Sequence, residues 1–268
     1  MNAFAAIALW STVALLGLRL KHVPPFLLVG AALLIGGLAG LRRGTFRGLR
    51  PRTVLLGVYG LFAYHFCLFM ALRLAPPVET SLLNYLWPLL MVALAPVLLP
   101  ECALKPRHLA GVLLGFGGVI LLVAGETSGP LSGHAAGYGL AVAAAFIWAS
   151  YSLLTKRFGG SGTAGVSACC LISGALSLAC HAAFEPRYAF VAADAASLLA
   201  LGLGPLGVSF YLWDRAVKEG DPRAIATLAY LTPLLSTAWL TLFGGGRLTL
   251  ASAAAAALIV GGAVVGSR

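Results

Sequence analysis

The sequence predicts an all-α integral membrane protein with ten transmembrane helices, arranged as two inverted-topology five-helix repeats. Of its 268 residues, 60% are hydrophobic and only 10% are charged, whereas soluble domains carry about 25% charged residues. The charges are clustered and leave ten charge-free stretches of at least 18 residues, close to the ~20 residues that cross a bilayer. A segment of the first half also recurs in the second half. This composition leaves no room for a soluble domain.

The first half of the chain contains five predicted spans, separated by charges and prolines. The first span has no positive charge before Arg19, unlike a signal peptide, so we expect a helix that is retained. The second and fourth spans follow Pro24-Pro25 and Pro76-Pro77, and the fifth follows Arg107. The five predicted spans are residues 3–18, 26–41, 53–73, 78–99 and 108–124.

The second half contains five more predicted spans with short, glycine-rich connections. The charge-free windows 127–155 and 158–184 are longer than one span, but each holds a Gly/Ser-rich loop beside a single helix. The connections include Gly159-Gly160-Ser161-Gly162 and Gly244-Gly245-Gly246. The five predicted spans are residues 136–156, 164–184, 195–214, 223–243 and 249–266.

Lysines and arginines fall unequally on the two sides of these ten spans. Thirteen lie on the side of the N-terminus and five on the opposite side. Because cytoplasmic loops carry the excess of basic residues, both termini are predicted to be cytoplasmic. The net charge of +10 therefore reflects membrane orientation, and we expect no nucleic-acid partner, since the basic residues lie in short loops between apolar spans.

A repeat relates the two halves of the chain. A shift of 145 residues superposes Leu83–Leu90 on Leu228–Leu235 with six of eight positions identical, and it superposes Pro77 on Pro222. A weaker match at a shift of 138 superposes Trp10 on Trp148. Five spans per repeat make the second repeat enter the membrane from the opposite side, as in many secondary transporters. The predicted repeats are residues 1–125 and 134–268, within one membrane domain.

Aromatic residues are the first candidates for a binding site. Trp and Tyr form belts at membrane interfaces, but several lie five or more residues inside their predicted spans. Rings at this depth contact either lipid or the bundle interior, and their N–H and O–H groups need partners, which favours the interior. Trp213 lies near the cytoplasmic end of its span and is assigned either to the cavity or to the interface. The candidates are Trp10, Tyr64, Tyr85, Trp87, Trp148, Trp213 and Tyr230.

His65 is a titratable side chain deep in a span, and no Lys or Arg is. Tyr64 and His65 share a helix face that could look into a central cavity, and we expect His65 to contact substrate. A His satisfied by a hydrogen bond to a neighbouring helix is the alternative interpretation. Phosphorylated substrates need Arg or Lys donors, so a neutral, zwitterionic or aromatic substrate is predicted.

Asn84 belongs to a polar stripe on the fourth span that ends at a proline. Ser81, Asn84, Tyr85 and Pro88 share one face by their three- and four-residue spacing. Pro88 and its repeat equivalent Pro233 each remove a backbone N–H. They are predicted to kink two helices around one site, although helix kinks without ligand contact remain an alternative.

These features resemble a known transporter family. Ten spans as five plus five, a basic side, and Tyr-Leu-x-Pro-Leu-Leu in the fourth and ninth spans are similar to the drug/metabolite transporter superfamily of the EamA-domain type. The deep aromatic cluster is similar to that of YddG-type aromatic amino acid exporters. The resemblance implies a multi-pass protein of the bacterial inner membrane that binds a small molecule, an aromatic amino acid above all.

The predicted function is a secondary transporter that exports small aromatic or neutral amino acids or metabolites by alternating access. We expect uniport or facilitated efflux, because only His65 could relay a proton within the spans. A broad multidrug exporter of the same fold is the alternative. An enzyme is not expected, since GxSxG, HExxH and Asp-rich motifs are absent from the sequence.

The remaining expectations concern partners. The five cysteines form no CxxC pair and no His lies at metal-ligand spacing from them, so neither a metal nor a cofactor is expected. Glycine spacings such as Gly111-x₃-Gly115 let helices approach closely. We expect this packing to occur within the fold, with a monomer favoured over a dimer and with membrane lipid around it.

Overall fold

In the part of the chain that the structure describes, all regular secondary structure is helical. The computed structural model describes residues 1–42, 45–46, 49–123, 134–158, 163–244 and 250–267. Some sequence predictions fall outside these residues: those for Arg43, Arg47, Arg247 and Arg268, for Gly159–Gly162 and Gly245–Gly246, and for the repeat boundary at residue 125.

The first half contains α1 (Asn2–Ser11), α2 (Val13–Arg19), α3 (Pro25–Ala39), α4 (Pro51–Gly57), the π-helix η1 (Val58–Ala63), α5 (Tyr64–Leu74), α6 (Pro77–Asn84), α7 (Trp87–Leu98) and α8 (Pro106–Val123). The second half contains α9 (Ala135–Arg157), α10 (Ala164–Phe184), α11 (Asp194–Leu203), the π-helix η2 (Gly204–Val208), α12 (Ser209–Glu219), α13 (Pro222–Ala229), α14 (Leu231–Gly244) and α15 (Leu250–Ser267). Proline is the first residue of α3, α4, α6, α8 and α13, where its missing N–H costs no helical hydrogen bond.

Seven helical stretches of the described chain are long and apolar enough to cross a membrane. They coincide with the predicted first, third, fourth, sixth, seventh, eighth and ninth spans. Three shorter apolar helices, Pro25–Ala39, Pro106–Leu121 and Ser252–Ser267, lie at the predicted second, fifth and tenth spans. At about 1.5 Å per residue they fall short of the ~30 Å bilayer core. The seven stretches are Asn2–Arg19, Pro51–Leu74, Pro77–Leu98, Ala135–Arg157, Gly165–Phe184, Asp194–Glu219 and Pro222–Phe243.

Five of the predicted spans are interrupted near their middle. The first is broken at Thr12 between α1 and α2, the third and eighth contain the π-helices η1 and η2, and the fourth and ninth are broken at Tyr85–Leu86 and at Tyr230. A proline ring clashes with the carbonyl four residues earlier. For Pro88 and Pro233 those residues are Asn84 and Ala229, which are the last residues of α6 and α13. The two prolines therefore account for the ends of both short helices.

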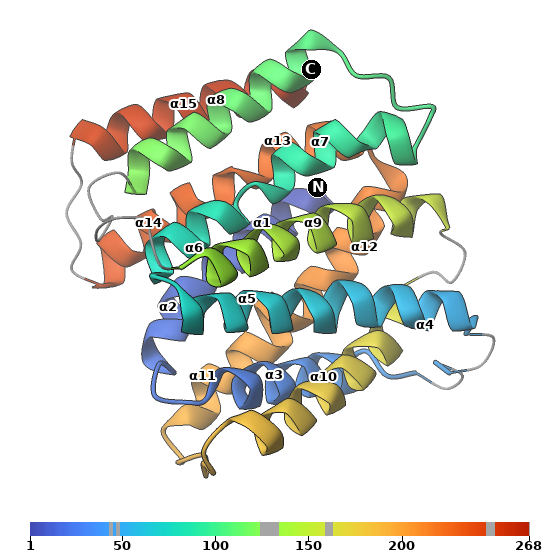
Figure 1. The fold of residues 1–268 in the computed structure, drawn as a ribbon, viewed down its shortest axis with the longest axis vertical. Helices are drawn as coiled ribbons and strands as arrows, with labels where there is room; N and C mark the ends of the chain where they lie inside the picture. The colour runs from blue at the N-terminus through green and yellow to red at the C-terminus, as the bar shows by residue number, and fades with distance from the viewer. Residues whose placement is uncertain (43–44, 47–48, 124–133, 159–162, 245–249, 268) are drawn as a thin grey trace.

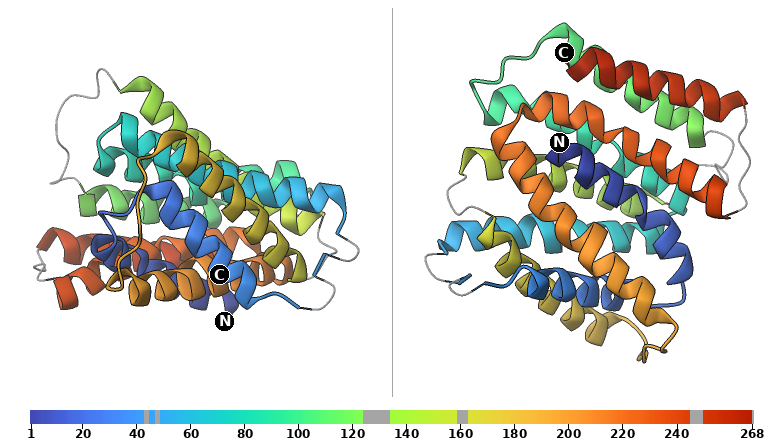
Figure 2. Two further views of the ribbon diagram at one scale, coloured as in Figure 1. Left: turned by 90° about the horizontal axis from the view of Figure 1, so that it is seen from below. Right: turned by 180° about the vertical axis from the view of Figure 1, so that it is seen from behind.

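The helices pack as a bundle whose two edges are helix pairs (Figure 1). α8 lies against α15 at one edge, and α3 lies against α10 and α11 at the other (Figures 1 and 2). Between these edges, α9 packs against α5, α7 and α12, and α1 packs against α12 and α14. We call the end of the bundle that carries the N-terminus, the segment 99–105 and the end of α9 the N-terminal face, and the other end the opposite face.

Glycines bring the paired helices close together within the chain. A Cβ on Gly111 of α8 would lie 2.6 Å from the Cα of Gly266 of α15, and one on Gly262 would lie 2.6 Å from the Gly111 carbonyl oxygen. Any side chain at these positions would push the two backbones apart. The glycine-lined surfaces of α8 and α15 are thus used within the fold.

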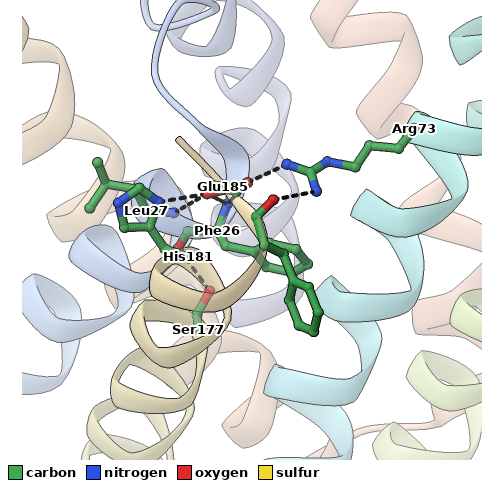
Figure 3. A network of polar contacts seen from close by, with 7 residues as sticks. Phe26, Leu27, Arg73, Ser177, His181 and Glu185 are labelled. Atoms are coloured by element: carbon green, nitrogen blue, oxygen red, sulfur yellow. Dashed lines mark hydrogen bonds and ion pairs between the residues drawn. The ribbon is translucent and has the colours of Figure 1, made fainter. Parts of the chain in front are cut away.

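A buried carboxylate joins three helix ends at the opposite face (Figure 3). Glu185, directly after α10, accepts hydrogen bonds from the backbone N–H groups of Phe26 and Leu27 at the start of α3, at 3.0–3.2 Å. It also pairs with Arg73 near the end of α5 at 3.0 Å and with His181 of α10 at 2.9 Å. A carboxylate is stabilised at a helix N-terminus by its unpaired N–H groups and its dipole. The ends of α3, α5 and α10 are fixed to one another in this way.

Candidate functional site

A central cavity of about 340 Å³ lies between α1, α5, α6, α9 and the η2–α12 segment, within the ~300–1,000 Å³ range of small-molecule sites. Its lining includes Val13 at the start of α2, Val29 near the start of α3 and Leu72 near the end of α5. These positions show that the cavity extends from the centre of the bundle toward the opposite face. Seven of the nine predicted binding residues line it: Trp10, Tyr64, His65, Asn84, Tyr85, Trp87 and Trp148.

The two other predicted residues lie behind the cavity wall. Trp213 is 2% exposed and packs against Trp10, Trp87 and Trp148, with ring centroids at 4.9, 5.5 and 6.3 Å. Tyr230 is fully buried against Phe116, with ring centroids at 6.4 Å. Trp213 and Tyr230 thus lie outside the lining of this cavity, and each contacts residues that belong to it: Trp213 through its ring contacts, and Tyr230 through a hydrogen bond to the carbonyl oxygen of Tyr85.

Trp148 is the centre of the aromatic cluster. Its ring lies 5.6 Å from that of Trp10, 5.2 Å from that of Tyr64 and 6.5 Å from that of Trp87, measured between centroids. The rings meet edge-on or tilted, the arrangement that aromatic quadrupoles favour. Four helices thus contribute rings to one aromatic wall.

The indole N–H groups of the cluster are satisfied by hydrogen bonds between helices. Trp10 donates from Nε1 to the carbonyl oxygen of Pro205 in η2 at 3.1 Å, and Trp213 donates to the Ser152 hydroxyl at 3.0 Å. Wide π-helical turns alter the hydrogen-bond ladder and recur at functional sites. The η2 segment therefore offers a carbonyl that orients Trp10 at the cavity wall.

His65 is the second residue of α5, directly after η1, and it lines the cavity. Its Nδ1 lies 2.5 Å from the carbonyl oxygen of Leu61. Since a carbonyl can only accept, Nδ1 carries the proton, and the neutral ring then keeps Nε2 as an acceptor. The bond lies within its own helical segment, not with a neighbouring helix as in the alternative interpretation.

Polar atoms without partners lie beside the aromatic wall. Asn84 donates from its amide nitrogen to the Tyr64 hydroxyl at 3.2 Å. Within the part of the chain that the structure describes, the Asn84 Oδ1 and Thr232 Oγ1 atoms are buried and have no hydrogen-bond partner, although both residues line the cavity. A buried acceptor without a partner is costly, so a ligand or water that supplies a donor here would be favoured.

Several residues of the lining were not predicted from the sequence. Leu68 and Phe69 follow Tyr64 and His65 by four residues, so helical spacing alone would have found them. Phe210 lies 5.9 Å from Trp148 between ring centroids and occupies the place expected for Trp213. The other unpredicted lining residues are Val13, Val29, Leu72, Pro205, Leu206 and Thr232.

The lining carries no formal charge, since none of the described residues that form it is Lys, Arg, Asp or Glu. An aromatic ring can pack on its walls, and an ammonium group can be held by ring faces and carbonyl-type oxygens. The arrangement suits an uncharged or zwitterionic aromatic molecule better than a multiply charged anion.

Residues 1–124 and 135–268 both match the EamA-like transporter family. The chain belongs to this family. The resemblance to EamA-type members of the drug/metabolite transporter superfamily is thereby confirmed, and the protein is a multi-span membrane transporter rather than an enzyme.

Similar proteins extend over nearly the whole chain. An aromatic amino acid exporter YddG from Ancylobacter novellus is 43% identical, with 98% of this chain and 94% of the relative covered. YddG of Escherichia coli K12 is 28% identical over 97% of this chain and 93% of its own. A crystal structure of a protein with 42% identity superposes with a TM-score of 0.93, covering 98% of this chain and 94% of that one.

Proposed function

We propose that this EamA-family transporter exports small aromatic or neutral amino acids across the bacterial inner membrane by alternating access. The observation that carries the proposal is the central cavity, whose walls combine Trp10, Tyr64, Trp87 and Trp148 with no formal charge. The name of the YddG relatives, aromatic amino acid exporter, points to the same substrate class.

The substrate would be held by two parts of the cavity. Its aromatic side chain would pack against the Trp10 and Trp148 rings. Its ammonium group would donate to the unpartnered oxygens of Asn84 and Thr232 and to Nε2 of His65. Both Pro88 and Pro233 would keep the interrupted helices bent around this site.

Ten spans in two inverted repeats would give the alternating movement. Three apolar helices shorter than a full span would complete the seven long ones, because thinning of the bilayer can accommodate short spans. Residues that the repeat superposes also meet at the centre: Trp10 contacts Trp148, and Tyr230 contacts Tyr85. Self-contact of equivalent residues is what a two-fold axis through the site produces.

The proposed orientation rests on charge. Most of the lysines and arginines that the structure describes lie at the N-terminal face, which would therefore be cytoplasmic. The central cavity extends toward the opposite face, so the conformation described would be open to the periplasm. We infer uniport as the mode of transport, because His65 is the one imidazole, carboxylate or amine among the described lining residues.

Flux assays in liposomes test the proposal. Purified protein should release preloaded, labelled tryptophan or phenylalanine, and protein-free liposomes should not. Absence of protein-dependent flux would overturn it. Ethidium and quaternary amines serve as the comparison, since faster transport of these cations than of amino acids would assign the cavity to multidrug export instead.

A further inference from the structure

A second cavity lies on the N-terminal face of the bundle. It measures about 110 Å³ and is formed by α4, α9, α10 and α12. It shares no lining residue with the central cavity. The residues that matter for its chemistry are Arg50, Arg52, Tyr151, Asp214 and Lys218.

One layer of aromatic rings separates the two cavities. Trp148 lines the central cavity and Tyr151 lines the second, and their ring centroids are 5.5 Å apart. Trp213, the residue before Asp214, closes the same layer and holds α12 to α9 through its hydrogen bond to Ser152. The second cavity is therefore the next space that a molecule would occupy on the other side of this barrier.

Lys156 closes the N-terminal face beside this barrier. Its ammonium group donates to the carbonyl oxygens of Val217, Lys218 and Gly220 at 3.1, 3.0 and 2.9 Å. These carbonyls belong to the end of α12, where backbone acceptors lack helical partners and a cation is stabilising. A path between the cavities would open only if α12 moved away from α9. That movement would break the hydrogen bonds of Lys156 and the hydrogen bond between Trp213 and Ser152.

The second cavity differs from the central one because it carries charges of both signs. The Asp214 carboxylate, whose side chain is 5% exposed, pairs with Lys218 at 2.7 Å. Arg50 and Arg52 are exposed, and neither guanidinium group has a hydrogen-bond or ion-pair partner among the residues that the structure describes. Guanidinium groups bind carboxylates through paired hydrogen bonds, and a carboxylate binds ammonium. The lining thus complements the charged end of a zwitterion.

We infer that the second cavity is a cytoplasmic loading site, where Arg50 and Arg52 bind the carboxylate of an amino acid and Asp214 binds its ammonium group. The inference rests on the proposed export function and orientation. A volume of about 110 Å³ is below the ~300 Å³ of sites that enclose a whole ligand. While the barrier is closed, the site holds the charged end of the substrate, and movement of α12 then joins it to the central cavity.

The test measures uptake into inside-out membrane vesicles, where the cytoplasmic face is exposed to added substrate. The probes are L-phenylalanine and L-phenylalaninamide, which lacks the carboxylate. The test variant is Arg50→Gln/Arg52→Gln, and its matched control is Arg107→Gln, an exposed arginine on the same face that lines neither cavity. Purified variants are compared by size-exclusion chromatography, so that a folding defect is recognised.

The double variant should lower Vmax/KM for L-phenylalanine about tenfold, as expected for loss of a charge-assisted hydrogen bond. Its Vmax/KM for the amide should change less than about twofold, and Arg107→Gln should alter neither value. Arg50→Lys/Arg52→Lys should recover part of the loss, because it keeps the charge without the paired donors.

Any of three results would contradict the proposed loading site. The first is transport of both probes by the double variant at the rates of Arg107→Gln. The second is an equal loss for both probes. The third is a loss that disappears in liposomes of zwitterionic lipid alone, which would assign the arginines to lipid headgroups. If the wild-type protein transports neither probe, the proposed function itself fails, so the two failures are distinguishable.

Discussion

The Tyr230 hydroxyl donates a hydrogen bond to the backbone carbonyl oxygen of Tyr85 at 3.3 Å, across a separation of 145 residues. That separation equals the shift that superposes the two halves of the sequence. Both tyrosines stand at the interruptions of their spans, between α6 and α7 and between α13 and α14. Carbonyls near a helix break lose their helical partners, and here one equivalent residue supplies the donor for the other.

Tyr230→Phe should lower stability while keeping the fold. The substitution removes one buried hydrogen bond and leaves a carbonyl without its donor, at a cost of about 1–2 kcal/mol. The midpoint of thermal unfolding in detergent should fall by a few degrees. Tyr138→Phe is the control, since Tyr138 is only partly buried; equal midpoints for the two variants would contradict a structural role for the Tyr230 hydroxyl.

Trp148→Phe should impair transport more than it impairs folding. Trp148 contacts rings from four other helical segments and lines the central cavity. A smaller ring enlarges the cavity and weakens packing on the substrate, so we expect a KM for phenylalanine at least about fivefold higher, equivalent to roughly 1 kcal/mol. Trp239→Phe changes a tryptophan outside the cavity and should leave KM unaltered; wild-type KM in both variants would exclude Trp148 from the site.

Two substitutions of His65 separate its two nitrogens. His65→Asn can place an amide nitrogen near Nδ1 and keep the bond to Leu61, whereas His65→Gln extends its amide toward the position of Nε2. If Nε2 contacts substrate, the Gln variant should transport faster than the Asn variant. The reverse order would show that the bond to Leu61 is what matters. An imposed pH gradient should drive no uphill accumulation in either variant or in the wild type.

Sequence periodicity predicted much of the central cavity because depth and helix face are local properties. Tyr64, His65, Asn84 and Tyr85 sit on faces that a regular helix defines, and all four line the cavity. Trp10 and Trp148 were found by their depth and by the repeat. The hydrophobic pattern alone also placed the helices in the order that the structure displays.

Trp213 shows what the sequence could not reveal. A π-helix adds a residue to a turn, so η2 rotates every later residue of the eighth span relative to an unbroken helix. Phe210 consequently faces the cavity and Trp213 lies behind it. The charged second cavity was likewise missed, because Arg50, Tyr151 and Asp214 come together only through packing of α4, α9 and α12.

Asp221 should make the fold sensitive to acid. Burial opposes ionisation of this carboxyl group, but the hydrogen bonds and the charge of Arg223 outweigh it and lower the pKa of Asp221. A lowered pKa in the folded state stabilises the protein above the unfolded value of about 3.9. This contribution is lost as the pH falls through the lower, folded value. Asp221→Asn should unfold at a lower temperature than wild type at pH 7, and the difference should shrink toward pH 3; a constant difference would contradict the linkage.

Glu185→Gln should be the most destabilising of these substitutions (Figure 3). The Glu185 carboxylate has no exposed surface and pairs with Arg73, whose side chain is 34% exposed. Glutamine keeps the shape but removes the charge, and its NH₂ group would face backbone N–H groups or Arg73, which are donors too. Breaking a buried ion pair on one side costs about 3–5 kcal/mol.

Glu219→Gln is the matched control, because its pair with Arg215 is 58–60% exposed and such pairs contribute at most about 1 kcal/mol. Thermal unfolding of the two variants should therefore differ clearly, and since Glu185 joins α3 to α5, Glu185→Gln should also expose the start of α3 to faster amide exchange. Equal unfolding temperatures would mean that the helix ends are held together without this carboxylate.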